Sequence, residues 1–168
     1  MKIRDRIREL RRVRARDLIP NPKNWRTHPQ AQQDALRGLL AEVGYADALL
    51  ARETPQGLVL IDGHLRAETT PDAEVPVLVV DVTEEEADKI LLSLDPLASM
   101  AEIDRDAIEK LLSTVATDSE AVRNLFAKLA EESGAAPPGF EPAGLDEQGR
   151  LDRKNQVTCP ECGHTFTP

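Results

Sequence analysis

Aromatic residues, cysteines and long apolar runs are all scarce in this sequence of 168 residues. Phe, Trp and Tyr make up only 3% of the chain, so aliphatic side chains have to fill any hydrophobic core. No run approaches the roughly 20 apolar residues that a membrane span needs, and the N-terminus lacks the apolar segment of a secretory signal. We therefore expect a cytoplasmic protein without a membrane partner.

The two cysteines, Cys159 and Cys162, both lie near the C-terminal end, so the preceding residues are expected to fold without disulfides. Cys-x-x-Cys-Gly is typical of one zinc-ribbon knuckle, and His164 adds a third candidate Zn²⁺ ligand. Because a structural zinc takes four ligands, the sequence leaves three alternatives open. The tail is a truncated zinc site, a site completed across a dimer, or a vestige.

Charge is unevenly distributed, although the net charge is −9. Residues 1–16 contain eight Lys or Arg side chains against two acidic ones, and the spacing of Ile3, Ile7, Leu10 and Val13 predicts a basic helix there. This segment either contacts a polyanion or pairs with the acidic remainder of the chain. An acidic body argues against broad, non-specific DNA binding.

Hydrophobic patterning predicts an alternation of helices and strands in the middle of the chain. We expect a helix over 30–43, a hairpin of strands 48–52 and 58–62, a short helix from His64, and a strand over 75–82 buried on both faces. A capping box, Thr83 with Glu86, begins a helix that Pro96 should end, and helices follow from Asp104 and over 119–131. The predicted organisation is a basic helix (1–16), an α+β domain (17–103), a helical extension (104–132), a linker (133–150) and a Cys-x-x-Cys tail (151–168).

The segment Asp62-Gly63-His64-Leu65-Arg66 is the first candidate site. The chain leaves a hydrophobic strand, turns at Gly63 and enters a helix, whose free N–H groups favour an anion. Arg66 would pair with a phosphate, His64 would donate to it or act as an acid or base, and Asp62 would orient His64 or hold a metal ion. The alternative is a plain Asp-Gly turn followed by an inert His and Arg.

The second candidate site is the proline-rich loop over residues 21–28. Prolines restrict its shape, and Asn21, Asn24 and Arg26 offer hydrogen bonds beside the single tryptophan, Trp25. A rigid polar loop with one exposed aromatic side chain is typical of a nucleotide or nucleic-acid contact. The alternative is that Trp25 fills the core and Asn21 caps a turn.

The order of these segments resembles the ParB N-terminal domain of the ParB/sulfiredoxin fold, especially its versions from phages and mobile elements. The resemblance covers about residues 14–103 and is carried by the order and spacing of several motifs. They are Asn21-Pro22-Lys23-Asn24-Trp25-Arg26, the helix from Gln32 to Gly44, Gly63-His64-Leu65-Arg66, Val75-Pro76-Val77, and Val82-Thr83-Glu84-Glu85-Glu86-Ala87.

The resemblance implies a small α+β domain with a mixed sheet packed by helices, followed by two short helices and a flexible tail. It implies one cleft that binds nucleotide phosphates, with Mg²⁺, or DNA. The phosphate-binding candidates are Asn21, Asn24, Arg26, Gly63, His64 and Arg66, and the catalytic candidates are Asp62 and His64. Sulfiredoxin chemistry is excluded because the box has no cysteine, and Leu65 replaces the second arginine of the partition proteins.

From this resemblance we expect a ParB-like nucleotide- or nucleic-acid-binding protein in plasmid or phage DNA maintenance. Two alternatives remain open at this point. One is a ParB-like nuclease or nucleotide hydrolase, and the other is a non-catalytic adaptor. The expected partners are a nucleotide, DNA and a second copy of the chain.

Overall fold

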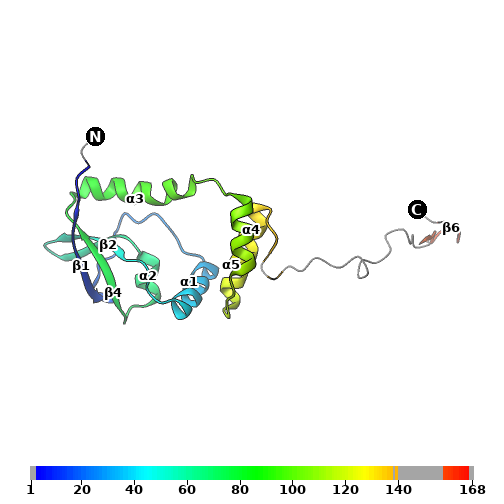
Figure 1. The fold of residues 1–168 in the computed structure, drawn as a ribbon, viewed down its shortest axis with the longest axis horizontal. Coiled ribbons are helices and arrows are strands. Elements are labelled where there is room, and N and C mark those ends of the chain that lie inside the picture. Colours follow the sequence, from blue (N-terminus) through cyan, green and yellow to red (C-terminus); the bar gives the residue numbers. More distant parts are fainter. Residues whose placement is uncertain (1–2, 138, 140–156, 167–168) are drawn as a thin grey trace. The chain divides into compact units, whose positions relative to one another are not determined.

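The computed structural model describes residues 3–137, 139 and 157–166. The chain divides into two compact units, Met1–Pro138 and Gly139–Pro168, and each is described by itself. No helix among the described residues is long and apolar enough to cross a bilayer. The first unit contains β1 (Ile7–Arg14), the 3-10 turn η1 (Ala15–Asp17), α1 (Gln30–Glu42), β2 (Leu49–Thr54), β3 (Gly57–Asp62), α2 (His64–Thr69), β4 (Glu74–Val80), α3 (Glu84–Ser99), α4 (Arg105–Thr114) and α5 (Glu120–Ser133) (Figure 1).

A four-stranded mixed sheet forms the centre of the first unit. Its strand order is β1-β4-β2-β3, in which β1–β4 and β2–β3 are antiparallel and β2–β4 is parallel. The β2–β3 hairpin and β4 lie where the sequence pattern predicts them. The predicted fold class, α+β with a mixed sheet packed by helices, is therefore confirmed.

Strand β4 is buried on both faces, as its unbroken apolar run predicts. Val77 and Val79 face one core, which also contains Ala67 of α2. Val80 faces a second core with Ala87 of α3. Successive side chains of a strand point to opposite faces. Strand β4 therefore packs against α2 on one side of the sheet and against α3 on the other (Figure 1).

The basic helix predicted over residues 1–16 is wrong. Residues Ile7–Arg14 form β1, which pairs with β4 so that Val13 lies opposite Val75. The backbone edge of β4 offers hydrogen bonds to an extended chain, and the partly buried Val13 packs against the core. This tertiary pairing outweighs the local helical spacing. The sheet consequently begins at Ile7, not at the predicted boundary of residue 17.

Several arginines of this N-terminal segment are paired with acidic side chains of the same unit. Arg6 donates to both carboxylate oxygens of Glu86, at 2.9 and 2.8 Å, and lowers the pKa of Glu86 to about 2. Arg8 and Arg11 contact Glu53 at 3.1 and 3.2 Å. These contacts favour internal charge pairing over a free polyanion-binding arm.

Helix α3 begins at the predicted capping box but continues beyond its predicted end. Thr83 Oγ1 accepts from the Glu86 N–H at 3.2 Å, and Glu86 Oε2 accepts from the Thr83 N–H at 2.9 Å. Pro96 lies inside the helix and lacks an N–H to donate. Its carbonyl nevertheless accepts from the Met100 N–H at 3.1 Å, so the last turn forms past the proline.

The helical extension packs onto α1 through α5. A Cβ atom at Gly38 of α1 would lie 2.2 Å from Ser119 Oγ, so glycine permits this close approach. Glu42 Oε1 also accepts from the Ser119 N–H at 3.0 Å, at the start of α5. The two helices after residue 103 are thus anchored to the same unit as the sheet.

Candidate functional site

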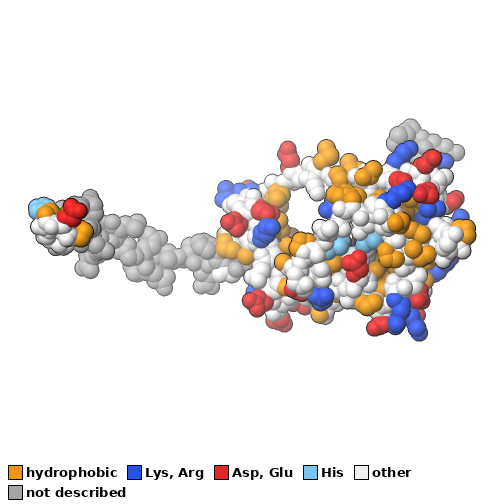
Figure 2. All heavy atoms as spheres, turned by 180° about the vertical axis from the view of Figure 1, so that it is seen from behind, with side chains coloured by type: hydrophobic (Ala, Val, Ile, Leu, Met, Phe, Trp, Pro, Cys, Tyr) orange, Lys and Arg blue, Asp and Glu red, His pale blue; other side chains and the backbone are white. Residues whose placement is uncertain are grey.

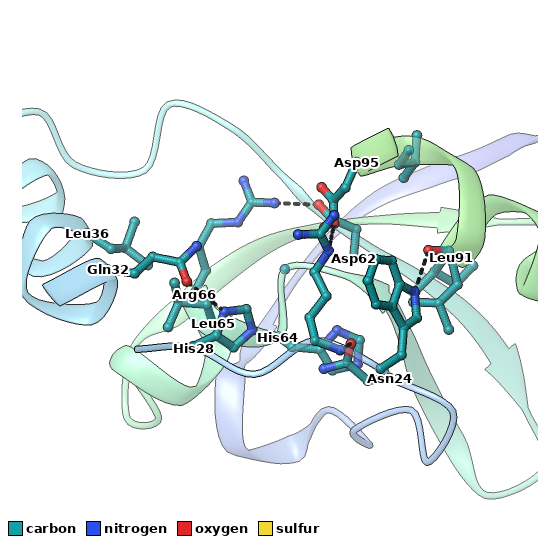
Figure 3. A pocket seen from close by; sticks show the side chains of 15 residues that line it. Asn24, His28, Gln32, Leu36, Asp62, His64, Leu65, Arg66, Leu91 and Asp95 are labelled. Carbon is teal, nitrogen blue, oxygen red and sulfur yellow. Dashed lines mark hydrogen bonds and ion pairs between the residues drawn. The ribbon is translucent and has the colours of Figure 1, made fainter. Parts of the chain in front are cut away.

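Two segments that are far apart in the sequence line one cavity of about 300 Å³. Asn24, Trp25 and Arg26 come from the loop before α1, and Asp62–Arg66 form the junction of β3 and α2 (Figure 3). Residues of α1 and α3 complete the walls. We call this cavity the cleft. The structure therefore brings together most of the predicted site residues from both motifs.

Gly63 is required for packing beneath the cleft. Its φ of +94° is a backbone conformation that favours glycine. A Cβ atom there would also lie 2.6 Å from Leu49 Cγ. The sequence predicted that this glycine lets a phosphate approach the backbone. In the structure, the absence of a Cβ atom at Gly63 makes room for the side chain of Leu49.

His64 is buried, with only 6% of its surface exposed, and it joins the two motifs. Its Nε2 accepts from the Asn21 N–H at 3.2 Å, so the proton of the neutral ring is on Nδ1. Burial lowers the pKa of His64, although the carboxylates of Glu68 and Asp62 oppose this. The hydrogen bond to the neutral imidazole therefore links the proline-rich loop to the start of α2.

Asn21 itself does not line the cleft. Its Oδ1 accepts from the Lys23 N–H at 2.9 Å, which makes the predicted alternative of a turn cap correct for this side chain. It lines a neighbouring cavity of about 270 Å³. In that region Lys23 Nζ contacts Glu84 at 2.8 Å and Asp88 at 2.7 Å.

Arg66 lies in the cleft between two carboxylates. Its Nη2 contacts Asp62 Oδ2 at 2.7 Å, and its Nη1 contacts Asp47. The hydrogen bond from Arg66 lowers the pKa of Asp47. The Arg66 side chain is 18% exposed, so its guanidinium is held in place yet remains accessible from the cleft. Asp62 acts as a direct partner of Arg66.

Trp25 and Arg26 form the opposite wall. The guanidinium carbon of Arg26 lies 4.5 Å from the centre of the Trp25 ring, and Arg26 Nε contacts Asp95 Oδ2 at 2.5 Å. The indole Nε1–H donates to the Leu91 carbonyl at 3.4 Å. Trp25 is 51% exposed, so it is a wall of the cleft and not a core residue.

The structure adds Gln32 and Asp95, which the sequence analysis did not select, to the walls of the cleft. His28 Nδ1 lies 3.1 Å from Gln32 Oε1, and both residues line the cavity. The spacing of four residues between them is a signal that was available. Asp95 had no such signal, because its partner Arg26 is distant in the sequence. The same holds for Asp47, which contacts Arg66 but does not line the cleft.

Among residues 3–137, 139 and 157–166, no group of three or more His, Cys, Asp or Glu side chains is arranged to hold a metal ion. The predicted three-ligand zinc site of Cys159, Cys162 and His164 is therefore not formed. Mg²⁺ commonly uses one or two carboxylates plus substrate phosphates, and Asp62 is positioned in the cleft to serve in that way.

The second unit contains a short hairpin around the cysteines. Strand β5 (Val157–Thr158) pairs antiparallel with β6 (Thr165–Phe166). The Cys159 N–H donates to the His164 carbonyl, and the Gly163 N–H donates to the Cys159 carbonyl, each at 2.9 Å. Both cysteines are free thiols. Hydrogen bonds from the backbone of Cys162 and Glu161 lower the pKa of the Cys159 thiol.

No protein-family model and no curated protein matches this chain. Among solved structures, C-terminally truncated chromosome-partitioning protein ParB from Caulobacter crescentus, complexed with CTP-γ-S, matches with a TM-score of 0.51 and 17% identity, over 77% of this chain and 73% of that one. The same protein complexed to the centromeric parS site has a TM-score of 0.39 and 14% identity, over 75% and 59%.

A Pnob8-like ParB-N domain has a TM-score of 0.42 and 17% identity, over 95% of this chain and 56% of that one. The chain thus spans less than two thirds of the parS-bound structure and of this domain. At such low sequence identities a structural similarity establishes the fold alone. Here the similarity to the CTP-γ-S complex establishes it. The described chain has an α+β fold similar to that of the chromosome-partitioning protein ParB.

Proposed function

We propose that the first unit binds a nucleotide in the cleft. Arg66 and Arg26 contact its phosphates, and Trp25 stacks against its base. One observation carries this proposal: both arginines and the only tryptophan of the chain line the same cavity of about 300 Å³, although they come from different segments. Guanidinium groups favour phosphates, and an indole ring favours a base.

The pairing of Arg66 supports a ligand with several anionic oxygens. Its two terminal nitrogens already contact one oxygen of Asp62 and one of Asp47. A planar guanidinium offers the same two-pronged geometry to a phosphate group. A bound nucleotide would therefore replace carboxylate oxygens by phosphate oxygens without moving the arginine far.

The fold is compatible with this ligand class. The ParB protein of similar fold was crystallised with CTP-γ-S, an analogue of a nucleoside triphosphate. In this chain Leu65 stands where the partition proteins have a second arginine, so Arg26 would contribute the additional positive charge. The nucleotide would bring Mg²⁺, which neutralises phosphate charge close to the carboxylate of Asp62.

His64 and Asp62 act as positioning residues in this proposal. The Nε2 atom of His64 is occupied by the Asn21 N–H, and Asp62 is occupied by Arg66. A general base needs a free acceptor within reach of the proton that it removes. These contacts favour binding over hydrolysis, the alternative in which Asp62 and His64 would be catalytic.

DNA is a weaker candidate than a mononucleotide. Acidic and basic side chains are interspersed over the face drawn in Figure 2, so the picture shows no basic patch of one sign there. The chain has a net charge of −9, whereas sequence-independent DNA affinity depends on phosphate neutralisation. A role in plasmid or phage DNA maintenance rests on the resemblance in sequence motifs alone.

The intrinsic fluorescence of Trp25 provides a direct test, because it is the only tryptophan and it lines the cleft. The full chain would be titrated with CTP, ATP, GTP and UTP, each with Mg²⁺, and with a short DNA duplex, and calorimetry would confirm each affinity. Arg66→Ala is expected to weaken nucleotide binding about 10- to 100-fold, the range for a lost charge-assisted contact.

Arg8→Ala is the matched control, because Arg8 also contacts two carboxylates, Glu53 and Asp81, but does not line the cleft. Unchanged affinity in this variant with a loss in Arg66→Ala supports the proposal. Absence of any nucleotide response overturns it and leaves the adaptor alternative. Release of phosphate with Mg²⁺ would show that the site hydrolyses its ligand.

A further inference from the structure

Strand β1 forms an outer edge of the four-stranded sheet. The strand order β1-β4-β2-β3 places it at one end, with β4 as its neighbour (Figure 1). At the other end the chain itself covers β3: the Ile19 N–H donates to the Leu58 carbonyl at 2.8 Å, and the Leu60 N–H donates to the Ile19 carbonyl at 2.9 Å. Within the described residues, β1 has no such cover on the side away from β4. The backbone groups on that side can pair with another extended chain.

The side chains of this edge are exposed and basic. The strand Ile7–Arg14 contains four arginines and one glutamate, and six of its eight residues are exposed. Leu10, Arg12 and Arg14 lie on one face of the strand, because side chains two residues apart point the same way. Leu10 is 60% exposed. The edge thus offers one apolar and two cationic side chains in a row.

Arg12 and Arg14 differ from the other two arginines of β1. Arg8 and Arg11 contact Glu53 at 3.1 and 3.2 Å. Arg12 and Arg14 form no ion pair within the part of the chain that the structure describes. Exposed guanidinium groups favour carboxylates, which they bind through two parallel hydrogen bonds. A second copy of β1 would place arginines opposite arginines, which is destabilising, so the charge of this edge fits an acidic strand.

We propose that β1 binds an extended acidic segment of another protein, which joins the sheet as a fifth strand. Main-chain hydrogen bonds along the edge provide affinity, and side chains at alternate positions provide specificity. Arg12 and Arg14 select carboxylates two residues apart on the partner, and Leu10 packs against an apolar side chain. The surface is independent of the nucleotide proposed for the cleft, because no residue of β1 lines that cavity.

The probe is a dye-labelled eight-residue peptide in which Glu alternates with Val, and fluorescence anisotropy follows its binding to the full chain. A peptide of alternating Lys and Val should not bind. Arg12→Glu/Arg14→Glu is expected to weaken binding of the acidic peptide by about 10-fold or more, because like charges then oppose each other. Arg37→Glu/Arg105→Glu is the matched control. It changes the net charge equally, on α1 and α4, and should keep the native affinity.

Circular dichroism verifies that the variants are folded, and Arg12→Lys/Arg14→Lys, which keeps the charge, should retain most of the affinity. Unchanged affinity in Arg12→Glu/Arg14→Glu, or no binding of the acidic peptide to the native chain, overturns the proposal. Binding of a short DNA duplex in place of the peptide, lost in the same variant, also overturns it and assigns the arginines to a nucleic acid.

Pairing through the backbone is tested on the native chain with two more peptides. One is N-methylated at its Glu residues and the other at its Val residues. The N–H groups of alternate residues point to opposite edges of a strand, so one methylated peptide should lose binding and the other should keep it. Equal affinity of the two methylated peptides overturns strand addition.

Discussion

The arginines in the cleft of the first unit are already paired with other side chains, whereas the thiols in the cysteine hairpin of the second unit are free. In the cleft, Arg66 and Arg26 are already paired with carboxylates. In the hairpin, both cysteines are free thiols, and backbone hydrogen bonds between Cys159, Gly163 and His164 close the turn. A ligand of the cleft has to replace the existing partners of the two arginines.

The two regions also differ in how they are built, which leads to the largest predicted effect. Gly63→Ala should destabilise the first unit by about 2–5 kcal/mol. The alanine would adopt positive φ at a cost of about 1–2 kcal/mol, and its Cβ would overlap Leu49, at a further cost of about 1–3 kcal/mol. Urea unfolding followed by Trp25 fluorescence measures the change.

Gly44→Ala is the control for this variant, because Gly44 has a φ of +82° but nothing within 4 Å of an added Cβ. It should show only the smaller backbone cost. Equal destabilisation by Gly63→Ala and Gly44→Ala would contradict the role assigned to the Leu49 contact.

The packing of α1 on α5 supports one wall of the cleft. Gly38→Ala should lower the free energy of unfolding by a net value of up to about 2 kcal/mol, because the overlap of the new Cβ with Ser119 Oγ costs about 1–3 kcal/mol and is partly offset. Replacing glycine by alanine inside a helix would otherwise stabilise it by about 1 kcal/mol. Urea unfolding measures the net change, and a net stabilisation would contradict the close approach of the two helices.

Competition between carboxylate and phosphate predicts a gain of function. Asp47→Asn removes one anionic partner of Arg66, and it should strengthen nucleotide binding several-fold. Asp72→Asn is the matched control, because Asp72 pairs with Arg16, which does not line the cleft. Fluorescence titration compares the two variants. Weaker binding by Asp47→Asn would show that this carboxylate contributes to the ligand site.

Lowering the pH should weaken the hydrogen bond by which His64 holds the proline-rich loop. Burial lowers the pKa of His64 in the folded protein, so the unfolded chain binds its proton more readily. The stabilisation is complete above the unfolded value of about 6.5 and decreases as the pH falls below it. The pKa of Glu86 is about 2, so the Arg6–Glu86 ion pair stays intact in a window from pH 8 to pH 5.

His64→Gln keeps a hydrogen-bond acceptor but does not titrate, so its free energy of unfolding should depend less on pH in this window. Urea unfolding at several pH values compares it with the native chain. An equal pH dependence in both proteins would mean that the charge of His64 has no part in holding the loop.

Local patterns predicted several elements of the first unit. Strand β4, the β2–β3 hairpin and the capping box of α3 all lie where the sequence places them. Spacing failed at Ile7–Arg14, where pairing with β4 decided the conformation. It also failed at Pro96, because a proline in a long helix removes only one hydrogen bond.

The sequence by itself selected Asp62–Arg66 and the proline-rich loop as candidate segments, and it set the two cysteines apart as a separate motif. Only the tertiary structure decided what each side chain contacts. Gly63 admits Leu49, His64 accepts from Asn21, and Arg66 lies between Asp47 and Asp62. The reason is physical: turns and caps depend on neighbouring residues, whereas buried hydrogen bonds and ion pairs depend on side chains that folding brings together from distant positions.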